Sequence, residues 1–545
     1  MLGLMQDRPL LITNMMEYAA TMHRDGEVIT KAIEGGIHRT NYGEITRRAA
    51  RMAHALTNLG VGQGDCISTL AWNSYRHLEL YMSIPCMGAI LNTVNPRLFP
   101  EQISYILNHA EAKILFLDLT FLPQVEKLAD SLPMLEKIVI MTDRAHMPES
   151  PLDNILCYEE LIAGEDDRFD WPELDENTAA GLCYTSGTTG EPKGALYSHR
   201  STVLHSMGLC TRDSLGLSSR EVVLPIVPMF HVNAWGTPYA AALSGATLVL
   251  PGADMTGENF FNLLRDEGCT IALGVPTIWL ALLNHVATLK DQDLTGLPIE
   301  HFIIGGSAVA PSLIDDMEKT FGATVLQAWG MTETSPLGSV NRPLAKYADL
   351  SDQDKMTRKV KQGRAPFCVE MKIVDDDDNE LPRDGVAFGR LKVRGPWVAK
   401  AYFKQPDLNI LDDEGFFDTG DVSTLDSDGT MTIVDRSKDV IKSGGEWISS
   451  IDLENVVMGN PRVAEAAVIG IAHPKWQERP LLIILPVAGT TPTKQDILAY
   501  LDGKIAKWWM PDDVLFIEEM PHTATGKIQK RDLRDMFRDY SFPGV

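Results

Sequence analysis

Cysteine is scarce in this chain, and its seven copies follow no pattern. They never occur in CxxC spacing, which excludes the common zinc motifs, and their odd number argues against a disulfide framework. We therefore expect reduced thiols in a cytoplasmic protein. The first residues also lack a basic segment followed by an apolar core, so no secretory leader is expected.

Long hydrophobic runs and an excess of positive charge are lacking as well. The most apolar window, 271–287, is interrupted by Pro276, Asn284 and His285, and is too short and too polar to span a bilayer. Acidic residues outnumber basic ones by 74 to 49, which gives a formal net charge of −25. Neither nucleic acid nor an anionic membrane is an expected partner, because both would be repelled. A nucleotide ligand would need cations gathered locally against this field.

Short apolar runs alternate with helical periodicity through most of the chain. A chain of 545 residues is too long for one core. The alternation predicts an α/β fold whose large N-terminal domain consists of layered α/β subdomains. The predicted strands are 66–71, 113–117, 179–183, 195–198, 222–227, 247–250, 301–304, 371–374, 466–471 and 481–487, and the predicted helices are 42–59, 78–87, 450–458 and 493–505.

The pattern changes after about residue 363. From there to residue 435, short strands with tight turns predict a small β-barrel-like subdomain. A compact α+β segment follows, and we place a domain boundary near Asp435. The predicted N-terminal domain is 1–434, and the predicted C-terminal domain, 435–545, has an ordinary size for a small domain.

The segment 184–194 is the most informative part of the chain. Its glycines, hydroxyls and lysine are Thr185, Ser186, Gly187, Thr188, Thr189, Gly190, Lys193 and Gly194. Glycine lets backbone N–H groups approach an anion, while hydroxyls and a lysine add donors and fixed charge. It is not a Walker A loop, because Glu191 and Pro192 separate Gly190 from Lys193. The segment predicts a loop that wraps phosphate oxygens.

Distant segments complement this loop. Trp329 and Glu333 combine a ring that suits a purine with a hard oxygen ligand of the kind that Mg²⁺ takes beside phosphates. Asp421, in a Thr-Gly-Asp turn, offers a carboxylate to the hydroxyls of a ribose. The bare Gly-Gly backbone within 304–308 suits a flat ring, although a strand-to-helix turn explains it equally well.

Two cationic segments complete the set. Three cations lie within 435–446, and Lys527 ends a Gly/Thr turn that is otherwise typical of a solvated surface. In this order and spacing the segments resemble the AMP-forming acyl-CoA synthetase, adenylation-domain and luciferase superfamily, from about residue 42 to residue 527. The segments 444–450 and 327–330 resemble those of bacterial short- to medium-chain acyl-CoA ligases, especially ligases of 3-methylmercaptopropionate.

The resemblance implies an active site between the large domain and a mobile C-terminal domain, with ATP, Mg²⁺ and coenzyme A as cofactor and co-substrates. The implied nucleotide-binding residues are Thr185, Ser186, Gly187, Thr188, Thr189, Gly190, Lys193, Gly305, Gly306, Ser307, Ala308, Ala328, Trp329, Gly330, Met331, Thr332, Glu333, Asp421, Arg436, Lys438 and Lys442. The implied metal ligands are Thr185 and Glu333. Lys527 is the implied adenylation lysine, Asp435 is a second implied catalytic residue, and Lys438 holds the hinge position.

Two half-reactions follow from the resemblance. A carboxylate attacks the α-phosphorus of ATP to give acyl-AMP and pyrophosphate, and the thiol of coenzyme A then attacks the activated carbonyl. One small domain serves both steps if it rotates about a hinge. Lys527 would face the site in the first step, and the segment Gly444, Gly445, Glu446 and Trp447 in the second.

The sequence indicates less about the implied acyl pocket than about the nucleotide site. Its implied residues are His231, Val232, Trp235, Gly305, Gly330 and Pro336. Trp235 is large enough to shorten the pocket and favour a short acid, but a position in the core explains it equally well. No acidic residue here suits an amino group, which disfavours amino acids. The expected substrate is a short or medium carboxylic acid, with 3-methylmercaptopropionate favoured by the resemblance.

Other readings stay open. A general medium-chain fatty acyl-CoA synthetase would share every motif, and a non-catalytic nucleotide-binding relic would share the fold. A carrier-protein adenylation domain is disfavoured, because only residues 528–545 follow Lys527. A luciferase-type oxygenase would share the ATP and hinge motifs. A homodimer is compatible with the sequence but not indicated by it.

Overall fold

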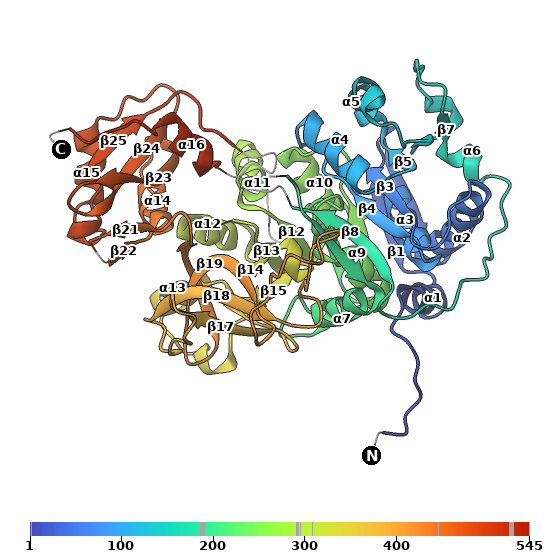
Figure 1. Ribbon diagram of the computed structural model, residues 1–545, viewed down its shortest axis with the longest axis horizontal. Helices are drawn as coiled ribbons and strands as arrows, with labels where there is room; N and C mark the ends of the chain where they lie inside the picture. The colour runs from blue at the N-terminus through green and yellow to red at the C-terminus, as the bar shows by residue number, and fades with distance from the viewer. Residues whose placement is uncertain are drawn as a thin grey trace.

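The structure is a computed structural model that describes residues 1, 3–185, 191–289, 294, 296–307, 309–444, 446–522 and 528–543, with the backbone alone for residues 446 and 447. A large N-terminal body contains two sheets, and a smaller C-terminal domain contains a third (Figure 1).

The first sheet of the body has seven strands and is parallel except for its last pair. Its spatial order is β7 (Ile155–Cys157), β6 (Lys137–Ile140), β5 (Ile114–Leu117), β3 (Cys66–Leu70), β4 (Ile90–Thr93), β8 (Ala179–Tyr184) and β9 (Gly194–Ser198). The antiparallel pair β8–β9 brings Tyr184 opposite Gly194, so these strands form the base of the predicted phosphate loop.

The second sheet has thirteen strands. Its order is β17 (Glu370–Val374), β18 (Phe388–Arg394), β19 (Phe417–Leu425), β20 (Thr430–Arg436), β16 (Gly363–Arg364), β15 (Leu337–Val340), β14 (Thr324–Gly330), β13 (His301–Ile304), β12 (Ile271–Gly274), β10 (Val222–Pro225), β11 (Thr247–Leu250), β1 (Glu27–Lys31) and β2 (Ile37–Asn41). The strands from β14 to β1 are parallel. Those from β15 to β17 pair antiparallel and continue the same hydrogen-bonded path.

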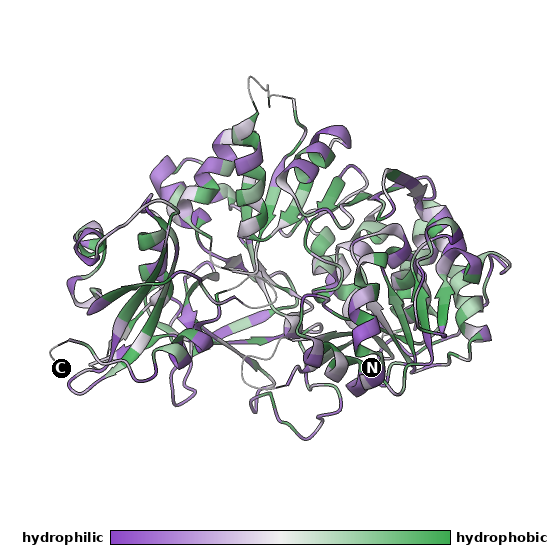
Figure 2. Ribbon diagram, turned by 90° about the horizontal axis from the view of Figure 1, so that it is seen from above, coloured by the Kyte–Doolittle hydropathy of each residue, from purple (hydrophilic) through white to green (hydrophobic). Residues whose placement is uncertain are grey.

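Helices cover both faces of both sheets. They are α1 (Ile12–Met22), α2 (Tyr42–Asn58), α3 (Tyr75–Cys86), α4 (Pro100–His109), α5 (Leu122–Leu128), α6 (Tyr158–Ile162), α7 (His199–Cys210), α8 (Val232–Trp235), α9 (Thr237–Ser244), α10 (Gly257–Asp266), α11 (Pro276–Thr288), α12 (Pro311–Phe321) and α13 (Asp352–Lys359). The central core joins both sheets through α1, α2, α3 and α9, while α4 and α5 cover the outer face of one sheet and α10 to α12 that of the other. Figure 2 shows apolar strands inside and polar helix faces outside.

The C-terminal domain is a compact α+β unit. Its strands are β21 (Ile441–Ser443), β22 (Glu446–Ile448), β23 (Val463–His473), β24 (Gln477–Pro486) and β25 (Asp513–Phe516), and its helices are α14 (Ser450–Met458), α15 (Lys494–Leu501) and α16 (Lys530–Met536). Two apolar clusters cover the two faces of this sheet. The domain thus has a core of its own.

The α/β architecture predicted from the sequence is confirmed. The segment predicted as barrel-like forms antiparallel strands, and these join the neighbouring sheet edge to edge. The predicted helix 493–505 ends earlier, at Leu501, because Asp502 is extended and Gly503 takes a φ of 76°. No helix of the described part of the chain has the length and apolar character needed to cross a bilayer.

Candidate functional site

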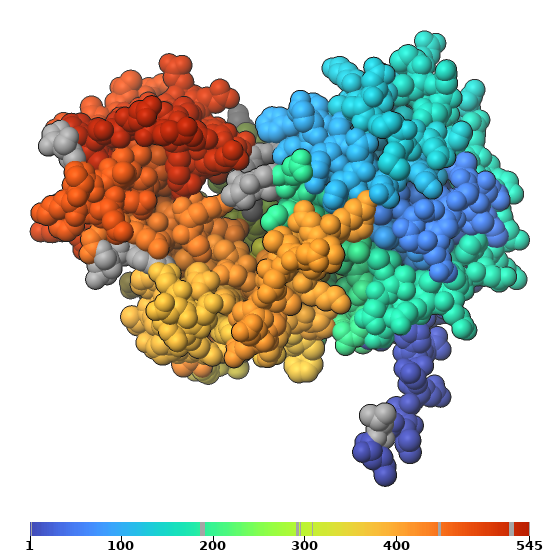
Figure 3. All heavy atoms as spheres, in the orientation of Figure 1, coloured from blue at the N-terminus to red at the C-terminus, as the bar shows by residue number. Residues whose placement is uncertain are grey.

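A cleft of about 2140 Å³ separates the N-terminal body from the C-terminal domain. Figure 3 shows the hollow between the red C-terminal domain and the blue and green body. The cleft is lined by these predicted site residues: Thr185, Lys193, His231, Val232, Trp235, Gly305, Gly306, Ser307, Ala328, Trp329, Gly330, Met331, Thr332, Glu333, Pro336, Asp421, Asp435, Arg436 and Lys438. Residues from six separate segments of the sequence therefore meet in one space.

The other predicted site residues either lie outside the described residues or do not line the cleft. Ser186 to Gly190, Ala308, Gly445 and Lys527 lie outside the described residues, as do the side chains of Glu446 and Trp447. Among residues that are described, Lys442 and Gly444 belong to the β21–β22 hairpin (Figure 1), and neither lines the cleft. The Lys442 amino group lies 4.0 Å from a carboxylate oxygen of Asp376.

The base of the phosphate loop is well ordered by hydrogen bonds. The backbone N–H of Thr185 donates to the carbonyl of Lys193 at 2.9 Å, which extends the β8–β9 pairing by one step. The ammonium of Lys193 lies 5.0 Å from the centroid of the Tyr402 ring. A cation held over an aromatic face at the mouth of the loop supplies the local positive charge that a phosphate needs in this acidic protein.

Glu333 is a buried carboxylate beside this loop. Only 5% of Glu333 is exposed, and the phenol of Tyr402 donates to its Oε1 at 2.7 Å. The adjacent backbone is fixed because the N–H of Ala399 donates to the carbonyl of Glu333, and the phenol of Tyr197 donates to that of Thr332. Burial makes an unpaired carboxylate costly, so this one is suited to a cation placed within the cleft.

Asp421, at the centre of β19, is held between two donors. The indole Nε1 of Trp329 donates to its Oδ2 at 2.9 Å, and the Arg436 Nε lies 2.9 Å from its Oδ1. Trp329 is 7% exposed and Asp421 is 3% exposed. The aromatic, the carboxylate and the guanidinium are thus preorganised as one unit on the cleft wall, from three different strands and their ends.

Trp235 lies on the cleft wall and packs against Gly305. A Cβ at Gly305 would stand 2.7 Å from the carbonyl oxygen of Ala328 and 3.0 Å from the Trp235 ring. The position therefore requires glycine, and the indole covers the end of β13. Trp235 is half-buried: it lines the cleft and also packs against the central core, so its position is compatible with both interpretations.

The junction between body and C-terminal domain is buried and ionic. The Asp435 carboxylate is fully buried and accepts the N–H groups of Arg436 at 2.7 Å and Ser450 at 2.6 Å. The Lys530 ammonium donates to the Ser450 hydroxyl at 2.6 Å and lies 2.7 Å from Glu454. Burial raises the pKa of Asp435 and of Glu454, and the cation of Lys530 opposes that rise in both.

The described residues on either side of Lys527 reach the cleft in this arrangement. His522 and Ile528, which flank the residues around Lys527, both line the cleft and pair with each other as an antiparallel bridge. The imidazole Nε2 of His522 lies 2.9 Å from a carboxylate oxygen of Glu465. Lys438, at the predicted hinge, also lines the cleft, and burial lowers the pKa of its ammonium.

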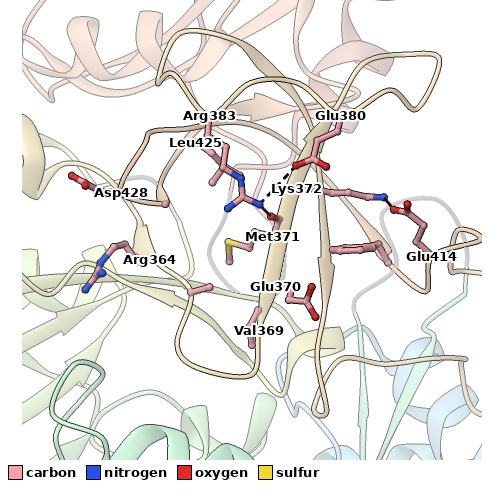
Figure 4. A pocket seen from close by; sticks show the side chains of 13 residues that line it. Arg364, Val369, Glu370, Met371, Lys372, Glu380, Arg383, Glu414, Leu425 and Asp428 are labelled. Atoms are coloured by element: carbon pink, nitrogen blue, oxygen red, sulfur yellow. Dashed lines mark hydrogen bonds and ion pairs between the residues drawn. The ribbon is translucent and has the colours of Figure 1, made fainter.

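A second cavity, of about 410 Å³, lies on the antiparallel strands and contains none of the predicted site residues (Figure 4). Two of its three cations are already engaged: Lys372 pairs with Glu414, and Arg383 donates to the carbonyl of Met371 at 2.7 Å. Four carboxylates also line it, which disfavours phosphate. We therefore assign the nucleotide chemistry to the large cleft.

Sequence reasoning missed Tyr402, which contacts both Lys193 and Glu333. It follows β18 in a segment with no glycine-rich or cationic motif, so no local signal marks it. His205 of α7 was also missed, since a lone histidine in an apolar helix is usually a core residue.

Comparisons with known proteins agree with this geometry. Residues 16–403 match the model of the AMP-binding enzyme family, and residues 452–527 match that of the AMP-binding enzyme C-terminal domain. The chain is 52% identical over 539 residues, 99% of each chain, to the 3-methylmercaptopropionyl-CoA ligase of Ruegeria pomeroyi. It is 47% identical over 541 residues to the medium-chain-fatty-acid–CoA ligase of Ectopseudomonas oleovorans, covering 99% of this chain and 98% of that one.

A solved structure shares the fold across both domains. The anthranilate CoA ligase AuaEII in complex with anthranoyl-AMP superposes with a TM-score of 0.84, at 26% identity, over 98% of this chain and 99% of that one. The resemblance to the superfamily is thereby confirmed. The chain belongs to the AMP-binding enzyme family.

Proposed function

We propose that this enzyme joins a short carboxylic acid to coenzyme A at the expense of ATP, through an acyl-AMP intermediate that releases pyrophosphate and then AMP. The observation that carries the proposal is the convergence of the phosphate-loop base, Glu333 and the Asp421–Arg436 unit in one cleft closed by the tail domain. The close relatives are named as CoA ligases, which supports the same reaction.

In the first half-reaction two anions must meet, a carboxylate and a triphosphate. Charge builds on the α-phosphate and on the departing pyrophosphate, so positioning and electrostatic stabilisation are the main tasks of the protein. We assign phosphate binding to the loop 185–193, adenine to the walls at 305–308 and 328–332, and ribose to Asp421 and Arg436. We assign Lys527 as the cation at the reacting phosphate.

Mg²⁺ fits the residues present. Thr185 offers a hydroxyl and Glu333 a buried carboxylate, one oxygen of which is already fixed by Tyr402, so the donor set is the hard oxygen type that Mg²⁺ prefers. These two residues would hold the ion. When bound, it neutralises phosphate charge.

The second half-reaction needs another arrangement of the small domain. We propose that rotation about Lys438 withdraws the tail segment and brings in Gly444, Gly445, Glu446 and Trp447 to receive the pantetheine arm. Support comes from the arrangement observed, in which the two ends of the tail segment line the cleft while Gly444 lies against the ring of Trp476, outside it.

The acid is proposed to be 3-methylmercaptopropionate. The walls contributed by α7, the following loop and β15 carry Leu209, Leu215 and Leu337, and Trp235 limits the depth available. Apolar walls suit a thioether or alkyl chain and offer nothing to an ammonium group. The alternative, a medium-chain fatty acid, is favoured by the second relative, since a straight chain would meet the same walls.

A panel of acids tests the proposal. AMP release that depends on coenzyme A is measured with 3-methylmercaptopropionate, propionate, butyrate, hexanoate and octanoate. We expect the highest kcat/KM for 3-methylmercaptopropionate and a decline beyond six carbons. A maximum at octanoate would support the medium-chain alternative. Failure of every acid to exchange labelled pyrophosphate into ATP would instead indicate a nucleotide-binding protein without catalysis.

Three further assignments belong to the proposal. The division into residues 1–434 and 435–545 is supported by the separate core of the tail domain. A cytoplasmic location is supported by the cysteines, all of them free thiols. A homodimer is an expectation that size-exclusion chromatography with light scattering decides.

A further inference from the structure

A single buried histidine contacts both walls of the acyl end of the cleft. His205 lies in α7 and is 2% exposed. Its Nε2 accepts the backbone N–H of Leu337 at 3.2 Å, and its ring packs on Gly236, where a Cβ would stand 2.5 Å from the ring. His205 is not itself a lining residue among those described, so any effect on substrate passes through its neighbours.

The first wall is a strained turn. The four residues of α8 have φ angles of 46°, 53°, 47° and 57°, a left-handed turn built from Val232, Asn233, Ala234 and Trp235, and Gly236 continues it with φ 79°. Left-handed backbone costs such residues roughly 1–2 kcal/mol each, so the surroundings must hold it. Tyr81 does so through Asn233, whose Oδ1 accepts the phenol at 3.0 Å. The turn places the Trp235 ring against Gly305, and Gly236 at the end of the turn packs against the His205 ring.

The second wall is the start of β15. Pro336 and Leu337 line the cleft, and both backbone groups of Leu337 are held by side chains. Its N–H donates to Nε2 of His205, and its carbonyl accepts the indole N–H of Trp397 at 2.9 Å. The Trp397 ring meets the His205 ring edge-on, with centroids 5.9 Å apart. His205 and Trp397 therefore fix the position of this wall.

The charge state of His205 suits this role. Burial lowers its pKa to about 3, so the ring is neutral under physiological conditions. Because Nε2 accepts a hydrogen bond, the proton of the neutral ring is on Nδ1. If the Nε2 acceptor of His205 is removed, the buried N–H of Leu337 loses its hydrogen-bond partner. Leaving a buried N–H unpaired costs more free energy than losing a hydrogen bond at the surface.

We propose that His205 is a positioning residue for acid selection, which sets the spacing between the Trp235 turn and the Pro336–Leu337 wall. The inference rests on the proposed function and deepens it, because a fixed spacing confines the acyl chain to a short, slender group. The nucleotide half of the cleft has supports of its own: Tyr402 donates to Glu333, and Trp329 donates to Asp421.

His205→Phe and His205→Gln test the proposal with a matched control. Phenylalanine keeps a ring but has no acceptor, whereas the glutamine oxygen reaches a place close to that of Nε2. For His205→Phe we expect KM for 3-methylmercaptopropionate to rise about tenfold, a loss of roughly 1.4 kcal/mol, with KM for ATP unchanged. Selectivity against octanoate falls as well, and His205→Gln stays within about threefold of the parent.

His199→Phe is the control. His199 is the first residue of α7, is fully buried, and accepts the N–H of Ile12 through Nδ1 at 3.1 Å. Its replacement therefore removes the same kind of bond, but one made to the start of α1 and not to an acyl wall. For His199→Phe we expect the ratio of KM for 3-methylmercaptopropionate to KM for ATP to stay as it is in the parent enzyme. If His205→Phe does not fold, His205→Asn replaces it, since its shorter amide does not reach Leu337.

The outcomes separate the two levels of the argument. Equal shifts in KM for acid and ATP, or no shift in either, would overturn the role of His205 while the ligase activity stands. Absence of acid-dependent pyrophosphate exchange in the unmodified enzyme would overturn the proposed function and this inference together.

Discussion

Glu333 illustrates how one residue depends on distant parts of the chain. Its carboxylate is buried in the cleft wall, and the only described side chain that an observed hydrogen bond brings to it is that of Tyr402, 69 positions away. The same tyrosine carries the ammonium of Lys193 over its ring. One aromatic residue therefore aligns the proposed metal ligand with the proposed phosphate cation.

Glu333→Gln removes the negative charge and keeps the size of the side chain. We expect acid-dependent pyrophosphate exchange to fall by about 100-fold, because an electrostatic contact to the metal and its phosphates is lost. Higher Mg²⁺ concentrations should restore part of the rate. Glu414→Gln, the same change in the small cavity of Figure 4, should leave exchange as it was. Equal rates in all three proteins would exclude Glu333 from the site.

Trp235 gives a prediction on substrate size. Replacing it by alanine empties the space beside Gly305, so kcat/KM for octanoate relative to 3-methylmercaptopropionate should rise by about tenfold or more. Trp508→Ala, at a half-exposed indole of the C-terminal domain, is the matched control. Unchanged relative rates after Trp235→Ala would mean that another side chain limits the pocket.

At the scale of elements, the end of β20 is joined to the start of α14 and of α16. Asp435 accepts the N–H of Ser450, and Lys530 bridges Ser450 and Glu454. The sequence predicts catalytic chemistry for Asp435, and that prediction is compatible with its place on the cleft wall. Its two carboxylate oxygens are nevertheless engaged by backbone N–H groups, so it also ties the body to the tail domain.

Lys530→Met tests this junction. The buried carboxylates of Asp435 and Glu454 would be left without their cation, so the free energy of unfolding of the tail domain should fall by about 3–5 kcal/mol. Lys494→Met removes a more exposed lysine that pairs with Asp513 in the same domain, and should cost about 1 kcal/mol or less. Urea unfolding followed by fluorescence measures both. Similar losses of unfolding free energy in the two variants would show that the buried junction stabilises the domain no more than the exposed ion pair does.

Local sequence was enough for some of the elements and for part of the cleft lining. The helix 450–458 and the strands 247–250 and 301–304 were predicted with their observed bounds, since apolar periodicity and turn residues are local signals. The left-handed turn 232–235 was not predictable, because its residue types favour negative φ and its support comes from the distant Tyr81. Tyr402 was missed for the same reason, being placed by tertiary packing.

At the scale of the whole molecule, three buried histidines link stability to pH. Burial lowers the pKa of His77 and of His199 to about 4 and that of His205 to about 3. Each is neutral when folded and takes up a proton when unfolded below its ordinary value of 6.5. Their contribution to stability is therefore complete above pH 6.5 and is lost as the pH falls through 6.5 towards 4.

His77→Gln should remove the uptake of one proton on unfolding, so the free energy of unfolding should depend less on pH. The stability difference between the variant and the parent should be constant above pH 7 and should narrow below pH 6 by about 1.4 kcal/mol per pH unit. Urea unfolding at a series of pH values between 7.5 and 5 gives the slope. Parallel curves over the whole range would mean that the pKa of His77 is the same in the folded and the unfolded protein.

The two domains face each other across the cleft, and this arrangement has a kinetic consequence. On the proposed mechanism, a tail lysine is needed while pyrophosphate departs, and it has no task once the phosphates are gone. Lys527→Ala separates the steps: acyl-AMP formation is measured by pyrophosphate exchange, and thioester formation is measured from supplied acyl-AMP and coenzyme A. The account predicts that exchange falls by 100-fold or more while thioester formation stays within about threefold. An equal loss in both half-reactions, or full exchange without the lysine, would contradict it.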